Sequence, residues 1–240
     1  MIYNFFTSVF FVFFSITAPT TTTPKNTEAS KTIAAVTTSA NTGSATMAIY
    51  NSLNANSLAL PAFESFDKAL KGFNQLKAQG IIKKDILTLI DFSMSSNSKR
   101  LWIIDMSTKT VLYNTLVAHG RNSGEEFATQ FSNDNSSNKS SLGFYATGEI
   151  YNGKHGESMK LDGLEAGINS NARARAVVMH AADYVSETFA KQHNRIGRSL
   201  GCPALPNGLN KEIIHLIKGK SCLFIYHPSR NYVQSSKLLS

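Results

Sequence analysis

Residues 174–205 read ARAVVMHAADYVSETFAKQHNRIGRSLGCPAL and carry the clearest structural pattern of the chain. The stretch opens with a continuous apolar run that ends at His180, which is typical of a buried strand. Residues 181–194 then read as a short helix, and a loop containing glycine and arginine follows. This loop carries Cys202, one of only two cysteines in 240 residues. The pattern therefore predicts a strand, a helix and a loop that holds a cysteine.

Working outward, apolar runs on both sides predict more strands than helices. Strands are expected at 85–94, 101–104, 111–117 and 221–228, and tight β-structure with turns at 141–167. One helix is expected over 61–80, where Phe63, Phe66, Leu70, Phe73 and Leu76 share a face and Gly80 is the stop. A second is expected over 209–220, with Asn207 or Asn210 as its cap and Gly219 at its end.

This pattern predicts an α+β domain that is rich in β-structure and has a few short helices. We expect residues 58–90 to form a helical segment that packs on a main domain at 91–230, with a tail at 231–240. The polar stretch 121–141 is expected to be a long loop, and loops of this length in compact domains are usually functional or mobile.

The N-terminal region differs from the rest in composition. Residues 1–18 are apolar and carry no charged side chain, which predicts a secretory signal with cleavage after Ala18; a retained membrane anchor is the alternative. Residues 19–57 are rich in Thr, Ser, Ala and Asn, so they bury too little apolar surface to fold and are expected to be a disordered linker. The chain is therefore expected to be exported to the periplasm or cell envelope.

The formal net charge is +8, which favours an anionic partner, although such a charge also serves solubility. No run of lysine and arginine is dense enough to predict a nucleic-acid site. The sequence contains no HExxH or CxxC pattern, so we expect neither a metal nor another cofactor.

Cys202 is the candidate nucleophile, and a reactive cysteine needs a base nearby because the thiolate is the reactive form. His180, at the end of the apolar run, is the histidine best placed to be that base. Gly201 allows a sharp turn beside the cysteine, and backbone N–H groups there can hold an oxyanion. Ser199 can orient the histidine or a substrate carbonyl. Arg195 and Arg198 can lower the pKa of the cysteine and bind a carboxylate.

Ser199–Cys202, read as Ser-Leu-Gly-Cys, resembles the Ser/Thr-x-Gly-Cys signature of the murein L,D-transpeptidase catalytic domain family of the YkuD type. VVMHAADYVS, which ends at Ser186, is similar to the strand that carries the family's catalytic histidine, and SMKLDGLEAGIN precedes it as in that family. The likeness covers residues 101–227. The chain departs from the family pattern at Ala181, where glycine is common, at Pro203-Ala204, where an apolar residue and an arginine are common, and in its longer connection from histidine to cysteine.

The resemblance implies acyl transfer between peptidoglycan stem peptides through a thioester on the cysteine. It implies these roles: Cys202, His180 and Ser199 as catalytic residues, Gly201 and Leu200 at the oxyanion pocket, and Arg198, Arg195, His155 and Tyr145 as substrate-binding residues.

Other functions are compatible with the same residues. The domain can act as an L,D-carboxypeptidase or another peptidoglycan hydrolase if water replaces the acceptor amine, or as a wall-binding module without activity. A disulfide between Cys202 and Cys222 is a further alternative, which would remove the nucleophile.

Overall fold

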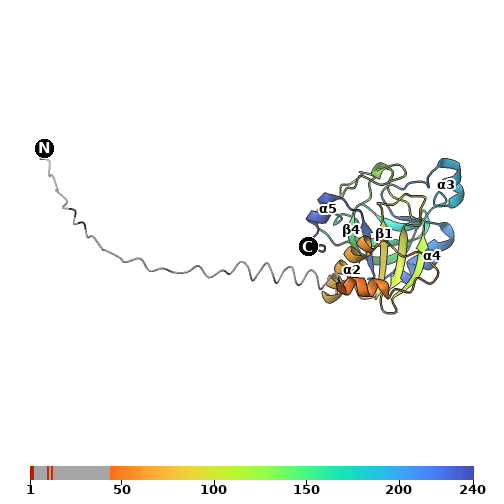
Figure 1. Ribbon diagram of the computed structural model, residues 1–240. Helices are drawn as coiled ribbons and strands as arrows, with labels where there is room; N and C mark the ends of the chain where they lie inside the picture. The colour runs from red at the N-terminus through yellow and green to blue at the C-terminus, as the bar shows by residue number, and fades with distance from the viewer. Residues whose placement is uncertain (3–9, 11, 13–43) are drawn as a thin grey trace. The chain divides into compact units, whose positions relative to one another are not determined.

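The computed structural model describes residues 44–240, together with residues 1, 2, 10 and 12. Apart from those four positions, the predicted export signal and the predicted linker up to residue 43 lie outside the described residues. In the described part, one eight-stranded sheet is accompanied by short helices, which confirms the predicted β-rich α+β class (Figure 1). None of the described helices is both long and apolar enough to cross a lipid bilayer.

The sheet is mixed, with strand order β3-β2-β1-β8-β4-β5-β6-β7. Two neighbouring pairs, β1 with β8 and β6 with β7, are parallel, and the other neighbours are antiparallel. The strands are Ile86–Asp91 (β1), Leu101–Asp105 (β2), Thr110–Thr115 (β3), Gly143–Gly153 (β4), Gly156–Gly163 (β5), Val178–Ala181 (β6), Ala204–Leu205 (β7) and Cys222–Tyr226 (β8).

The chain that follows β3 connects the two outermost strands of this sheet. Ala118 forms an antiparallel bridge with Ala204 of β7, and Gly120 forms a parallel bridge with Ser199. The N–H of Ala118 donates to the carbonyl of Ala204 at 2.9 Å, and the N–H of Ser199 donates to the carbonyl of His119 at 2.9 Å. These bonds fix both ends of the loop that carries Cys202.

The predicted linker is shorter than expected, because residues 44–51 form a helix. Tyr50 from this helix packs on Phe63 and Phe66 with ring centroids 5.3 and 5.5 Å away. Leu53 is buried, and Asn54 pairs with Thr110 at the edge of the sheet. The low-complexity composition of 19–57 concealed the few aromatic and apolar residues that reach the domain.

The expected boundary at residue 91 is also wrong, because β1 pairs with both β2 and β8 inside the sheet. Helix α2, Phe63–Ala78, packs against β1 and β8 as predicted for this segment. A Cβ built on Gly72 would lie 2.1 Å from Cζ of Phe144, so glycine lets this helix lie close against the sheet.

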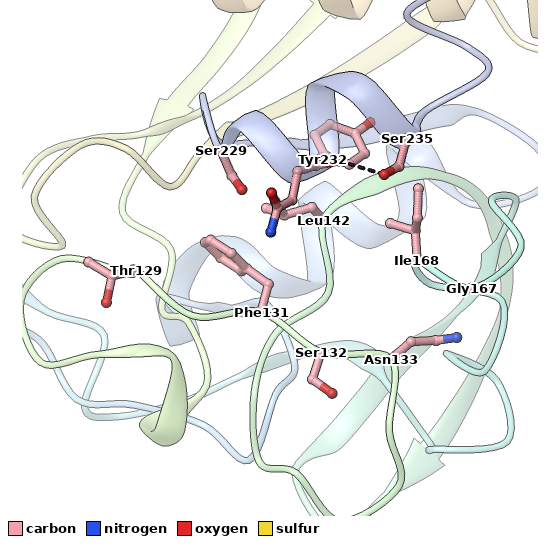
Figure 2. Close-up of a pocket in the computed structure, with 11 residues that line it drawn as sticks. Thr129, Phe131, Ser132, Asn133, Leu142, Gly167, Ile168, Ser229, Tyr232 and Ser235 are labelled. Atoms are coloured by element: carbon pink, nitrogen blue, oxygen red, sulfur yellow. Dashed lines mark hydrogen bonds between the residues drawn. The ribbon is translucent and has the colours of Figure 1, made fainter.

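The expected C-terminal tail is part of the domain. Helix α5, Arg230–Ser235, places Tyr232 beside Leu142 at the edge of a pocket of about 350 Å³ (Figure 2). Tyr232 is only 5% exposed, and its hydroxyl donates to the carboxylate of Glu165 at 3.2 Å. Ser236 also donates to Glu165, and the N–H of Phe144 donates to it at 2.8 Å. Glu165 therefore holds the C-terminal segment against β4.

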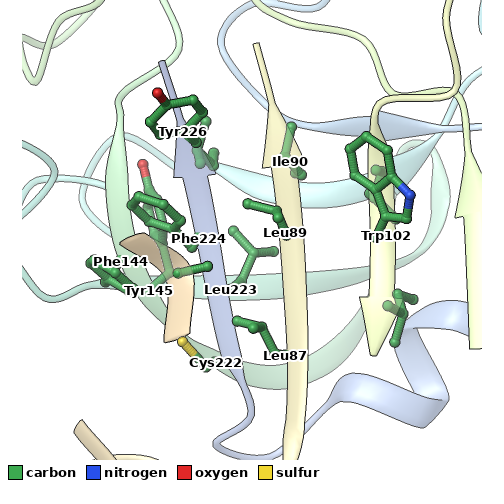
Figure 3. Packing of buried hydrophobic residues seen from close by; sticks show 14 of the residues in the cluster. Leu87, Leu89, Ile90, Trp102, Phe144, Tyr145, Cys222, Leu223, Phe224 and Tyr226 are labelled. Carbon is green, nitrogen blue, oxygen red and sulfur yellow. The ribbon is translucent and has the colours of Figure 1, made fainter. Parts of the chain in front are cut away.

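The core is centred on the parallel pair β1 and β8, on which Leu87, Leu89 and Leu223 are buried (Figure 3). Phe144 stacks on Phe224 with a centroid distance of 4.1 Å. Cys222 is fully buried in the same core, and both cysteines are free. The disulfide alternative is therefore wrong, since Cys222 lies inside the core whereas Cys202 is partly exposed.

Two helices near the candidate site differ from expectation at their ends. Helix α3, Glu187–His193, begins after Ser186, whose hydroxyl accepts from the N–H of Phe189 at 3.2 Å. Helix α4, Asn207–Ile217, has Pro206 rather than an asparagine at its N-cap. The asparagine side chains are used in tertiary contacts instead: Asn207 bonds Asp183, and Asn210 donates to the carbonyl of Glu157 at 2.9 Å.

Candidate functional site

A cavity of about 680 Å³ contains both Cys202 and His180. Its walls come from the tip of the β4–β5 hairpin, from the segment that leads into β6, and from the loop that carries Cys202. No aspartate or glutamate is among its lining residues, which are Tyr151, Gly153, Lys154, His155, Ser158, Arg175, Ala176, Val177, Val178, His180, Tyr184, Arg198, Ser199, Leu200 and Cys202. The cavity therefore suits a ligand with an anionic group.

The loop that carries Cys202 is held by two serines. The hydroxyl of Ser199 donates to the carbonyl of Cys202 at 2.6 Å and accepts from the N–H of Gly201 at 3.0 Å. The hydroxyl of Ser140 donates to the carbonyl of Gly201 at 3.0 Å and accepts from the N–H of Gly120 at 3.0 Å. Gly201 has φ of 125°, and a Cβ there would lie 2.9 Å from the carbonyl oxygen of Lys139. Ser199 thus shapes the turn and makes no hydrogen bond to His180.

The Cys202 thiol lies over the backbone that leads into β6. Its Sγ is 3.4 Å from the N–H nitrogen of Val178 and 3.7 Å from the carbonyl oxygen of Ala176. Burial raises the pKa of the thiol, while the Val178 N–H and the charges of Arg175 and Lys154 oppose that rise. At neutral pH the resting group is therefore a thiol, and forming the thiolate requires a base.

His180 offers that base in the same cavity. Its Nδ1 lies 2.8 Å from the carbonyl oxygen of Ala181, which can only accept, so Nδ1 carries the proton and Nε2 keeps its lone pair. The ring stacks on His155 from the hairpin, with centroids 4.4 Å apart and an interplanar angle of 20°. Burial holds the pKa of His180 below its usual value, with smaller effects of His155 and Lys154 in the same direction. Within residues 44–240, no hydrogen bond joins His180 to Cys202.

The loop also leaves backbone donors available. In the described part of the chain, the N–H groups of Leu200 and Cys202 donate to no protein acceptor. The N–H of Gly201 donates to the hydroxyl of Ser199 and is not available to a ligand. The N–H groups of the two neighbouring residues are therefore the remaining candidate oxyanion donors. Leu200 is 60% exposed and lines the cavity, whereas Gly201 does not.

The two arginines expected to bind substrate are tied to one carboxylate. Nη1 of Arg198 donates to Glu125 at 2.6 Å and to the carbonyls of Arg121 and Gly124 at 3.1 Å. Nε of Arg195 donates to the same Glu125 at 3.0 Å. Arg198 lines the cavity and Arg195 does not. Neither is among the charges that act on the pKa of Cys202.

The structure contradicts the expected role of Tyr145. This side chain is completely buried on β4, and its hydroxyl donates to the carbonyl of Ser141 at 2.9 Å. Tyr145 is not among the residues that line the cavity, so a ligand bound there does not touch it. By contrast, His155 is exposed and lines the cavity.

Sequence reasoning missed five lining residues with polar or charged side chains, which are Tyr151, Lys154, Ser158, Arg175 and Tyr184. Lys154 and Tyr151 lie beside the glycines of the β4–β5 turn, where a hairpin tip could have been suspected. Arg175 directly precedes the apolar run that ends at His180. This position near the candidate histidine was the signal in the sequence that could have identified Arg175. The pocket in Figure 2 contains neither cysteine nor histidine among its lining residues and is not a comparable candidate.

Comparison with known proteins shows the family of the chain. The family model described as L,D-transpeptidase catalytic domain matches residues 58–226, more than half of the chain. No curated protein matches the chain.

Solved structures of L,D-transpeptidases resemble the chain at low sequence identity. The enzyme from Mycobacterium smegmatis is 10% identical with a TM-score of 0.37, over 60% of this chain and 59% of that one. L,D-transpeptidase 3 from Mycobacterium tuberculosis is 7% identical with a TM-score of 0.39, over 60% and 61%. The enzyme from Stackebrandtia nassauensis is 10% identical with a TM-score of 0.37, over 69% and 68%. The chain thus spans less than two thirds of the length of the first two.

Proposed function

Because the chain belongs to the L,D-transpeptidase catalytic domain family, we propose that it is a cysteine acyltransferase that cross-links peptidoglycan stem peptides in the cell envelope. The observation that carries this proposal is that the Cys202 thiol and the His180 imidazole line one cavity. The absence of carboxylates among the cavity-lining residues also suits a peptide that ends in a carboxylate.

In the first half-reaction, Sγ of Cys202 attacks the carbonyl carbon at the L-centre of a donor stem, and its proton passes to Nε2 of His180. The N–H groups of Leu200 and Cys202 hold the resulting oxyanion. The C–N bond to the terminal D-residue then breaks, and the imidazolium returns its proton to the departing amine. The product is a thioester on Cys202.

In the second half-reaction, an amine of another stem attacks the thioester carbonyl and gives a proton to His180. The C–S bond breaks, and the imidazolium of His180 returns this proton to the sulfur, which restores the thiol. Since no hydrogen bond joins His180 to Cys202 within residues 44–240, a small movement has to bring Nε2 to the sulfur when the donor stem binds.

Labelling with a carbapenem tests the proposal, because acylation by this β-lactam requires a nucleophile activated in its cavity. We expect the protein to gain the mass of one carbapenem on the peptide containing Cys202. Cys202→Ala should gain none, while Cys222→Ala is the matched control that keeps the adduct, since Cys222 is fully buried. A folded native protein without an adduct would instead support a wall-binding module without activity.

Product analysis then separates transfer from hydrolysis. With purified muropeptides as donor and acceptor, we expect cross-linked dimers and release of the terminal D-residue. Release of that residue without dimers, even with excess acceptor, would identify an L,D-carboxypeptidase and contradict cross-linking.

We also propose that residues 1–18 export the chain, which their apolar and uncharged composition supports. A fusion of residues 1–43 to a reporter enzyme that is active only outside the cytoplasm should be active. A reporter that stays inactive and cytoplasmic would contradict export by this segment.

A further inference from the structure

Arg175 is bonded on two of its nitrogens to the polar segment 132–141. Its Nη1 donates to the carbonyl of Ser132 at 2.7 Å and to the hydroxyl of Ser141 at 2.5 Å. Its Nη2 donates to the carbonyl of Lys139 at 2.7 Å and to the hydroxyl of Ser137 at 3.1 Å. This guanidinium therefore fixes the segment at several points, and its position is set by the protein rather than by a ligand.

All four of these acceptors are uncharged, so the charge of Arg175 is not neutralised by a carboxylate. In the described part of the chain, Arg175 takes part in no ion pair. Arg173, two positions earlier, differs because it pairs with Glu149 and Asp162. Arg198, the other arginine of the cavity, pairs with Glu125.

The guanidinium lies against the loop that carries Cys202. A Cβ built on Gly201 would be 3.5 Å from Nη2 of Arg175 and 2.9 Å from the carbonyl oxygen of Lys139, which this same Nη2 binds. On the other side, Sγ of Cys202 contacts the carbonyl of Ala176, the residue that follows Arg175. The backbone of Ala176 turns sharply there, with φ of 54°.

We propose that Arg175 is the positioning residue of this site, which holds segment 132–141 against the cysteine loop and supplies the fixed positive charge that favours the Cys202 thiolate. The proposal deepens the proposed function and rests on it for the reactive role of Cys202. It replaces Arg195 and Arg198 in the charge-supplying role that the sequence suggested for them. The balance of charges acting on the pKa of Cys202, in which Arg175 comes ahead of Lys154, agrees with this geometry.

Arg175 is not the only ionisable group near the thiol. The ionisable groups that line the cavity around the Cys202 thiol come from four parts of the chain. They are Lys154 and His155 of the hairpin, Arg175 before β6, His180 of β6 with Tyr184 after it, and Arg198 of the cysteine loop. Lys154 is exposed at the hairpin tip and makes no hydrogen bond or ion pair within residues 44–240. Arg175 is the cation among them that is held by several hydrogen bonds, all of them to neutral groups.

The test measures the rate of Cys202 alkylation by iodoacetamide from pH 6 to 10, in a Cys222→Ala background with one thiol. We expect Arg175→Gln to raise the midpoint of this profile by about one unit, a roughly tenfold loss of thiolate at neutral pH. Arg175→Lys keeps the charge, so its midpoint should stay near that of the native side chain. Arg173→Gln is the matched control and should leave the profile unchanged.

A midpoint that is unchanged in a folded Arg175→Gln protein would overturn the proposal, because a purely structural arginine alters stability but not the thiol. If Arg175→Gln does not fold, the Arg175→Lys variant tests the proposal instead. A midpoint of its alkylation profile that lies about one pH unit above the native midpoint would overturn the role of the charge. Alkylation requires no acyl transfer. A native protein that is alkylated normally but never acylated by carbapenem or muropeptides therefore contradicts the proposed function alone.

Discussion

The two side chains proposed to react, Cys202 and His180, are both uncharged at neutral pH in this structure. Burial raises the pKa of Cys202 above the ordinary value of a thiol and lowers that of His180 below the ordinary value of an imidazole. The resting site therefore holds a neutral imidazole and a neutral thiol rather than an imidazolium–thiolate ion pair. The proposed mechanism requires neutral His180, so activity is expected to persist as the pH falls until the pH passes the lowered pKa of this histidine.

His180→Gln should change this pH dependence. Without a base, the thiolate forms only as the pH approaches the raised pKa of Cys202, above the ordinary 8.5 of a free thiol. The rate of carbapenem acylation is measured from pH 5 to 10. As the pH is raised, this rate should begin to increase below pH 6.5 in the native protein, but only above pH 8.5 in the variant. Overlapping profiles would show that His180 is not the base.

We expect Ser199 to act on the shape of the loop, because both hydrogen bonds of its hydroxyl lie within the loop. Ser199→Ala leaves the N–H of Gly201 and the carbonyl of Cys202 without their partner, which should cost about 1–3 kcal/mol of unfolding free energy. Acylation should slow with it, whereas Ser199→Thr keeps the hydroxyl and should retain most of both. Thermal denaturation and acylation rates check this, and an Ala variant with native values would contradict it.

Among the elements, the cysteine loop depends on one glycine. Gly201→Ala introduces a side chain at φ of 125° and places its Cβ 2.9 Å from a backbone oxygen, so we expect a loss of about 1–3 kcal/mol and of most acylation. Gly208→Ala in α4 is the control: its Cβ meets nothing within 4 Å, and removing a helical glycine should stabilise by about 0.5–1 kcal/mol. Urea denaturation of both variants checks this prediction, and equal stabilities would contradict it.

For the molecule as a whole, the N-terminal limit of the folded domain is testable by truncation. Removal of residues 1–43 should leave stability and acylation unchanged. Removal of residues 1–57 also deletes Tyr50, Leu53 and the pairing of Asn54 with Thr110, so the melting temperature should fall. A 1–57 truncation as stable as the longer protein would show that helix 44–51 contributes nothing.

Local patterns in the sequence were sufficient for most of the strands, for helix α2 and for choosing Cys202 and His180 as candidates. Apolar runs predicted β1, β2, β3, β6 and β8, and the spacing of Phe66, Leu70, Phe73 and Leu76 predicted α2 and its buried face. His180 at the end of its strand and Cys202 on its loop were both identifiable, because strand ends and glycine turns leave a signal within a few residues. Both side chains line the same cavity.

The tertiary structure decided which of the remaining groups meet that cavity. Arg175 forms hydrogen bonds with residues that lie 34 to 43 positions away in the sequence. Arg198 donates to Glu125 over a separation of 73 positions, and Glu165 accepts a hydrogen bond from Ser236 over a separation of 71 positions. Tyr145 shares the glycine-flanked stretch of the hairpin yet points into the core, since its side of the strand is set by pairing with β8. Short segments encode their own conformation through periodicity and turns, but the partner of a long polar side chain depends on how distant segments pack together.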